Sequence, residues 1–419
     1  MTDAVPTPLV EPRDGIPDVV VEEHELLRAA EALAGGSGPV AVDAERASGY
    51  RYGQAAYLVQ LRRRGAGTWL IDPVSCPDLT PVSAAIDGAE WVLHAATQDL
   101  PCLAEVGMRP SRLFDTELGA RLAGLPRVGL GAVVEEQLGL SLAKEHSAVD
   151  WSTRPLPEAW LRYAALDVEV LVDLRDAIAE LLERQGKLDW AEQEFAAIAN
   201  AAPPVPRVDP WRRTSGSHRL RTRRQLAMLR ELWTARDELA RQRDVSPGRV
   251  LPDAALVAAV QASPRTMEEL VAVPGFTGPA ARRHGARWLE ALTRGRKTPD
   301  ADLPLQSLPN DAPPPARSWA DRDADAAARL AYAKTELARM SEALCVPVEN
   351  LMTPDTVRRV LWDPPTDVDG RLTELRARPW QIELVGPVLQ AALQETDADR
   401  RAREAAARAS EPAPPAEQG

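Results

Sequence analysis

The 419-residue chain contains little cysteine and little histidine, and this scarcity limits the kinds of site it can hold. Its three cysteines, Cys76, Cys102 and Cys345, lie far apart and are odd in number. They predict neither a disulfide framework nor a zinc site built on thiolates. Such sparing use of cysteine indicates a reducing cytoplasm as the compartment of the protein.

Long apolar runs are also missing. No stretch approaches the length of a membrane span, and the opening MTDAVPTPLVEPRDG lacks the basic and then apolar order of an export signal. Hydrophobic residues at 45% and charged residues at 27% are typical of a globular protein in water. We therefore expect a cytoplasmic protein with no membrane partner, acting as a monomer, with two to four domains.

Positive charge is outnumbered overall, since 50 lysines and arginines against 62 acidic residues give a net charge of -12, but its distribution is uneven. Residues 211–250 contain eleven arginines against four acidic residues, a local net charge of +7. A basic segment inside an acidic chain indicates contact with nucleic-acid phosphates. Within RRTSGSHRLRTRR we expect Arg221, Arg223 and Arg224 to make such contacts, with a solvated helix surface as the alternative.

Two proline-rich stretches divide the chain, PPVPRVDP at 203–210 and a broader one from 298 to 318. Both are typical of extended linkers. After each of them the pattern is helical throughout. The predicted division is an α/β domain at 15–200, a linker at 201–215, a helical domain at 216–297, a linker at 298–318, a second, similar helical domain at 319–397 and a disordered tail at 398–419.

Strand-like runs gather near the beginning of the chain. They read GPVAVDAE, AAYLVQLRRR, TWLIDP and WVLHAA, and from about Asp99 onward the pattern becomes helical with short connections. A strand-rich beginning followed by alternating helix and strand predicts an α/β domain with a mixed sheet. The predicted fold is therefore this α/β domain followed by two small all-α helical bundles.

Acidic residues recur at positions where a buried element would carry them. In the first strand Asp43 and Glu45 are two residues apart and point to the same side, so their charges repel unless a cation lies between them. Asp99 follows a later strand. A lone acid at either place could equally lie at a solvated edge or in a favourable first helical turn.

A further acid lies on a helix that is predicted to begin at Pro157, a residue that suits the first helical position. At 100° per residue, Tyr163 and Asp167 share the apolar side, while Glu169 falls on the opposite, charged side. A carboxylate facing a core is costly unless it is paired or bound to a metal. Asp167 is therefore a candidate metal ligand, with a buried Asp–Arg pair as the alternative.

Together, D-x-E on an early strand, an aspartate after a later strand and Y-x-x-x-D on a helix resemble the DEDD exonucleases that have tyrosine in the third motif. HAATQDL, FDTELGARLAG and KEHSAVDWSTRPLPEAWLRYAALDVEVLVDL resemble successive segments of ribonuclease D. VPGF at 273–276, with TGPAARRHG after it, resembles the helicase-and-ribonuclease-D C-terminal (HRDC) domain.

The resemblance implies a ribonuclease H-like domain that holds two divalent cations, Mg²⁺ or Mn²⁺, and carboxylate oxygens suit such hard ions. It implies that Asp43 bridges both ions, that Glu45 and Asp167 hold the one beside the nucleophile, and that Asp99 holds the other. Tyr163 would position the attacking water. The implied reaction is hydrolysis of RNA from single-stranded 3′ ends, such as those of transfer RNA precursors, with release of nucleoside 5′-monophosphates.

Other readings remain open. A related domain could prefer DNA, and a pure binding module would show loss of some acids, whereas all five expected side chains are present. Lys144 and Arg154 could contact phosphates or the carboxylates of the site. We expect Trp151 to be structural and His94 to be a packed residue at the end of a strand.

Overall fold

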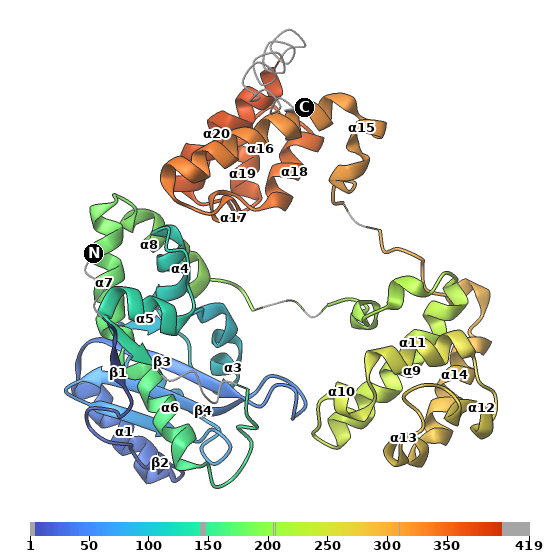
Figure 1. Cartoon of the computed structure of the whole chain (residues 1–419), viewed down its shortest axis with the longest axis horizontal. Coiled ribbons are helices and arrows are strands. Elements are labelled where there is room, and N and C mark those ends of the chain that lie inside the picture. The colour runs from blue at the N-terminus through green and yellow to red at the C-terminus, as the bar shows by residue number, and fades with distance from the viewer. Residues whose placement is uncertain (1–4, 143–147, 204, 206, 310, 396–419) are drawn as a thin grey trace, which may run out of the picture.

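The computed structural model describes residues 5–142, 148–203, 205, 207–309 and 311–395. Along these residues the chain forms an α/β region followed by two regions built from helices alone (Figure 1). This order confirms the predicted fold class. In the described part of the chain, no helix combines the length and the apolar character needed to cross a bilayer.

A six-stranded sheet forms the base of the α/β region, in the order β2-β5-β4-β3-β6-β7. β3 pairs antiparallel with β4 and parallel with β6, so the sheet is mixed, as predicted. The two short outer strands were not predicted, because so few residues show no alternation. The strands are β2 (Val19–Val20), β3 (Ser37–Arg46), β4 (Ala56–Arg64), β5 (Gly67–Ile71), β6 (Glu90–Leu93) and β7 (Arg112–Asp115).

The N-terminal segment makes a separate parallel pair, β1 (Thr7–Leu9) with β8 (Leu140–Leu142). It then runs beside helix α6 (Glu158–Glu169), where Glu11 accepts a hydrogen bond of 2.9 Å from Arg162. A segment more than 140 residues away in sequence thus supports the helix that carries Asp167.

The sheet separates two apolar clusters. On one face Leu58 and Leu70 pack with Trp151 and with Ala164 of α6, which lies across β3, β4 and β5. On the other side Val40 and the residues of α1 (Glu23–Gly35) belong to the main core. The remaining helices of the region are α2 (Thr80–Ala85), η1 (Ala96–Gln98), α3 (Leu100–Glu105), α4 (Thr116–Leu122), α5 (Leu130–Leu138), α7 (Leu171–Arg184) and α8 (Leu188–Ala199).

The long helix predicted from Pro157 onward is two helices, α6 and α7, with a break at Val170. Pro157 is the N-cap residue of α6, and the first helical residue is Glu158. The prediction that Glu169 faces solvent is wrong. Its side chain is 0% exposed and lies 3.3 Å from each of Arg13 and Arg62. All residues from Ala164 to Glu169 are buried, so this half of the helix has no solvent face on which a charged residue could lie.

The first helical region packs its helices around Trp288 and Phe276, both fully buried. Trp233 packs against this cluster, and Trp211 is buried in it. The elements are η2 (Pro210–Arg213), η3 (Ser217–Arg219), α9 (Arg223–Gln242), α10 (Pro247–Val250), α11 (Asp253–Ala262), α12 (Met267–Val271), α13 (Pro279–Arg283) and α14 (Gly285–Lys297).

The second helical region packs on the α/β region through α8. The ring of Trp380 stacks on that of Trp190 with centroids 5.0 Å apart, and its indole N–H donates to Glu194 at 3.1 Å. The elements after α14 are η4 (Asp300–Asp302), η5 (Ala316–Ser318), α15 (Trp319–Arg322), α16 (Ala324–Leu344), α17 (Val348–Leu351), α18 (Pro354–Trp362), α19 (Val368–Glu374) and α20 (Pro379–Gln394).

Candidate active site

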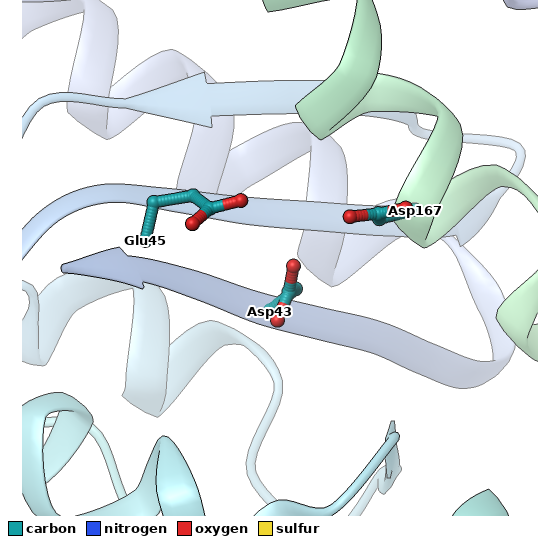
Figure 2. A group of neighbouring side chains, drawn as sticks. All are labelled: Asp43, Glu45 and Asp167. Atoms are coloured by element: carbon teal, nitrogen blue, oxygen red, sulfur yellow. The ribbon is translucent and has the colours of Figure 1, made fainter. Parts of the chain in front are cut away.

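Three of the four acids singled out in the sequence come together above the sheet. Asp43 and Glu45 project from β3, and Asp167 projects from α6 toward them (Figure 2). One carboxylate oxygen from each residue lies within 4.8 Å of the other two. The strand supplies two acids on one face because its side chains alternate, and the helix that crosses this strand supplies the third.

The fourth acid, Asp99, lies beside this group. It is buried, 5% exposed, at the start of α3, and its carboxylate pairs with Arg46 at 3.2 Å. The same guanidinium donates a 2.7 Å hydrogen bond to the carbonyl of Gln98. Arg46 therefore fixes Asp99 at the edge of the group, and its positive charge acts on Asp43, Glu45 and Asp99.

Burial and mutual repulsion both disfavour ionisation of these acids. Burial is the largest cause for each, and it raises the pKa of Asp43 to about 6 despite a backbone hydrogen bond and the charge of Arg46. The pKa values of Glu45 and Asp99 are raised by burial and then by the charge of Asp43. The pKa of Asp167 is raised for the same two reasons. The site thus carries more negative charge than its own residues compensate.

This arrangement fits divalent cations. The donors are all carboxylate oxygens, which hard ions such as Mg²⁺ and Mn²⁺ prefer, and no thiolate or imidazole belongs to the carboxylate group found among the described residues. A cation held between the carboxylates would offset the repulsion that raises their pKa values. The site is therefore suited to a metal-dependent reaction.

Tyr163 lies one helical turn before Asp167, and its hydroxyl makes a hydrogen bond with that carboxylate. Burial raises the pKa of the phenol, and the charges of Asp167 and Glu45 raise it further, so the hydroxyl keeps its proton at neutral pH. Its ring lies 6.4 Å from that of Trp151. Packing thus holds a protonated hydroxyl at the carboxylate cluster.

The structure adds a residue that the sequence analysis missed. Gln60 of β4 is directly opposite Asp43 of β3, so both side chains leave the same face of the sheet. Gln60 is fully buried, and among the described residues neither its amide nitrogen nor its oxygen has a hydrogen-bond partner. A polar residue inside the apolar run AYLVQL was the signal that could have revealed it.

A second missed residue supports Asp99. The carboxylate of Asp115 is buried and accepts hydrogen bonds from the backbone N–H groups of Ala95 and Ala96, at 3.0 and 2.8 Å. It thereby holds the turn that leads to Asp99. His94, in the same turn, is packed as expected, and burial lowers its pKa to about 4.

The loop before α6 carries the remaining residues singled out in the sequence. Arg154 binds Asp72 through two contacts of 2.7 Å and donates to the carbonyls of Trp151 and Tyr57, so its guanidinium is occupied within the domain. Trp151 is fully buried, as expected. Lys144 lies outside the described residues.

The three arginines predicted to contact phosphates differ in their surroundings. Arg223 donates to the carbonyls of Leu303 and Pro304. Arg224 binds Asp300 and donates to the backbone carbonyls of Arg296, in α14, and of Thr298, at the start of the linker. Arg221 is exposed. Two of the three thus bind the chain itself in this structure.

A mixed sheet whose central strand carries two acids, covered by a helix that supplies tyrosine and aspartate, defines a ribonuclease H-like 3′-5′ exonuclease. Family comparison agrees. The 3′-5′ exonuclease model matches residues 18–183, the HRDC domain model matches 225–292, and a model described as the 3′ to 5′ exonuclease C-terminal domain matches 312–393.

Named relatives give the family. Ribonuclease D of Gluconacetobacter diazotrophicus is 34% identical over 66% of this chain and 71% of its own length. Ribonuclease D of Escherichia coli K12 is 32% identical over 64% of this chain and 72% of its own length. The chain belongs to the ribonuclease D family and is a 3′-5′ exoribonuclease.

Solved structures extend the likeness over almost the whole chain. A protein from Bifidobacterium adolescentis is 36% identical and covers 93% of this chain and 100% of its own, with a TM-score of 0.85. Escherichia coli RNase D, described as an exoribonuclease involved in structured RNA processing, is 28% identical and covers 90% and 98%, with a TM-score of 0.68.

Proposed function

We propose that the chain trims single-stranded 3′ ends of structured RNA precursors, those of transfer RNA included, and releases nucleoside 5′-monophosphates. The observation that supports this most is the meeting of Asp43, Glu45 and Asp167 within 4.8 Å, with the Tyr163 hydroxyl bonded to Asp167. The structured-RNA processing named for the Escherichia coli relative supports the choice of substrate.

The proposed roles follow the positions of the side chains. Asp43 lies between the other acids and would hold both of two divalent cations, Mg²⁺ or Mn²⁺. Glu45 and Asp167 would hold the one beside the nucleophile, and Asp99 would hold the other. Bound cations supply Lewis acidity and a water of lowered pKa. The Tyr163 hydroxyl would orient that water toward the terminal phosphodiester.

The test uses matched RNA and DNA oligonucleotides, labelled at the 5′ end and incubated with Mg²⁺, Mn²⁺ or a chelator. We expect RNA to shorten one nucleotide at a time from its 3′ end with either cation and to stay intact with the chelator. Asp43→Asn should abolish shortening, whereas Asp18→Asn, which changes an exposed acid of the same domain, should not. Shortening by Asp43→Asn at the unaltered rate contradicts the proposal.

A preference for DNA is the second candidate, and the same assay separates it. If the DNA ladder forms faster than the RNA ladder at equal concentration, the polymer specificity proposed here is wrong while the active site stands. A binding module without activity would give no ladder with either polymer.

We further propose that the chain acts as a monomer in the cytoplasm and that its three regions, with the boundaries given above, fold as separate domains. The packed cores support the separation of the first helical region, because the cluster around Trp288 is distinct from the main core, which joins the α/β region and the second helical region. Size-exclusion chromatography with light scattering would test the monomer, and limited proteolysis within 298–318 would test the second boundary.

A further inference from the structure

The loop between β3 and β4 holds the HRDC region against the α/β region. The backbone N–H of Ser246 donates to the carbonyl of Tyr50 at 3.0 Å, and its hydroxyl donates to the carbonyl of Gly49 at 2.8 Å. Arg249 donates to Gly49 at 2.9 Å and lies over the ring of Tyr50, 4.2 Å from its centroid. We call residues 48–53 the docking loop.

Tyr52 and its neighbour add a second set of contacts, to the end of α9. The Tyr52 hydroxyl lies 3.1 Å from both carboxylate oxygens of Asp237 and accepts a hydrogen bond from Arg241 at 3.1 Å. Its backbone N–H donates to Asp244, which also pairs with Arg51, both at 3.3 Å. The docking loop therefore binds backbone and side chains of the HRDC region at several points.

The docking loop is also tied to the active site. It begins three residues after Glu45, just beyond the end of β3, the strand that carries Glu45. On its other side Arg51 donates to the Ser152 hydroxyl at 2.7 Å, in the segment that precedes α6. Any displacement of the HRDC region would therefore pull on the two stretches of chain that carry the catalytic acids.

Beside this junction several arginines gather around His284. Arg243 at the end of α9, Arg283 of α13 and Arg287 of α14 lie close enough for their charges to act on His284, and Arg282 is the neighbour of Arg283 on α13. Burial lowers the pKa of His284, and the charges of Arg243, Arg283 and Arg287 lower it further. We call these four residues the arginine cluster.

Most of this positive charge is uncompensated. Arg287 pairs with Glu238 at 2.9 Å, whereas within the described ranges Arg243, Arg282 and Arg283 are exposed and make no ion pair. Like charges brought together without counterions oppose folding, and a concave or flat surface carrying them attracts polyanions. Arg243 lies between Arg241 and Asp244, which both contact the docking loop, so the cluster is adjacent to the junction.

We propose that the arginine cluster binds phosphates of the RNA strand whose 3′ end occupies the active site, and that the docking loop fixes the cluster in position for this contact. The inference rests on the proposed function. It assigns the RNA contact to this end of the HRDC region instead of the segment around Arg223 and Arg224, where two guanidinium groups bind the linker. The preferred substrates are RNAs that extend well beyond the catalytic acids.

The first test compares single-stranded RNAs of about 4 and about 30 nucleotides, since only the longer one spans both sites. The variant combines Arg243→Gln, Arg282→Gln and Arg283→Gln. We expect the ratio of kcat/KM for the long RNA to that for the short RNA to fall about tenfold, through KM. The slope of log affinity for long RNA against log salt should become shallower by about 2, near 0.7 for each lost contact.

Two matched variants make the result specific. Arg109→Gln with Arg317→Gln and Arg322→Gln removes equal charge from exposed sites elsewhere, and it should leave the ratio unchanged. Arg213→Gln with Arg219→Gln and Arg221→Gln alters the basic segment that the sequence analysis predicted to contact phosphates. A larger effect from this second variant than from the cluster variant overturns the inference.

The docking loop has its own test. Tyr52→Phe keeps the ring but removes the hydroxyl that meets Asp237 and Arg241. We expect a several-fold higher KM for the long RNA with little change for the short one, because a loosened junction lowers the effective concentration of the second site. An unchanged KM for the long RNA would show that the docking loop does not position the cluster.

Failure of the proposed function would look different. If the unaltered protein hydrolyses neither RNA, the active-site assignment is wrong. If it hydrolyses both and the cluster variant behaves like it, only the second binding site is wrong. Binding of long RNA by Asp43→Asn, with and without the cluster substitutions, measures the contact without turnover.

Discussion

Replacement of Asp43 by asparagine should stabilise the protein in the absence of metal while abolishing activity. The pKa of Asp43 rises from 3.8 to about 6 on folding, chiefly through burial. Because the folded pKa lies above the unfolded one, folding favours the protonated acid. The contribution of Asp43 to stability is therefore present in acid and is lost as the pH rises from about 4 to about 6.

The size of the effect follows from the same shift. A difference of about 2 pKa units corresponds to about 3 kcal/mol at neutral pH, and coupling among the four acids reduces what one substitution recovers, so we expect about 1–3 kcal/mol. For a region of this size, 1 kcal/mol corresponds to about 2–4 °C in melting temperature. Asp43→Asn should therefore melt several degrees above the unaltered protein at about pH 8 with a chelator.

Thermal melts followed by circular dichroism, at about pH 4 and about pH 8, measure the gap and its sign. The gap should shrink in acid, because the unaltered Asp43 is then protonated. Added Mg²⁺ should raise the melting temperature of the unaltered protein more than that of Asp43→Asn, since binding to the folded state stabilises it. A variant less stable than the unaltered protein at about pH 8 with chelator would refute the inference that the buried charge of Asp43 destabilises the fold.

Three other substitutions test separate parts of the site. Tyr163→Phe should lower kcat about 10²-fold, less than Asp43→Asn, because the hydroxyl that orients the attacking water is lost. The stabilisation by Mg²⁺ should persist, because the carboxylates remain. Gln60→Leu should fold, yet need about tenfold more Mg²⁺ for half-maximal thermal stabilisation, because an amide opposite Asp43 is lost. An unchanged Mg²⁺ requirement would show that the amide does not contribute to cation binding. Arg62→Gln should lower the free energy of unfolding by about 2 kcal/mol in urea melts, because the fully buried carboxylate of Glu169 then loses one of its two cationic partners.

Alternation along a strand is a local property, and the sequence was sufficient to predict it. Asp43 and Glu45 are two residues apart in a run of strand-forming residues, so their common direction needed no knowledge of the rest of the chain. The sequence could not say that Gln60 lies opposite Asp43. That pairing depends on the register between β3 and β4, which is set by the turn between the strands and by what covers both faces of the sheet.

The helix that carries Asp167 shows where periodicity stops being informative. An amphipathic pattern assumes one buried face and one solvated face. The first half of α6 is exposed or half-buried, whereas every position from Ala164 to Glu169 is buried. Glu169 is tolerated there because Arg13, far away in sequence, and Arg62 of β4 reach it. No local pattern contains such partners.

Arginines pose the same problem for function. In sequence, Arg223 and Arg224 belong to the densest basic run, and Arg243, Arg282 and Arg283 look scattered. The fold changes which of these arginines are available to bind phosphate. Arg223 and Arg224 donate to carbonyls and a carboxylate in and just before the following linker. The other three lie at the end of the HRDC region that carries the docking-loop contacts, and they make no ion pairs among the described residues. A guanidinium can bind RNA only with donors that the fold has left free. Charge density along the chain therefore indicates that a protein binds nucleic acid, but it is a poor guide to which residues make the contact. Those residues have to be sought among the cations that the folded chain leaves without partners.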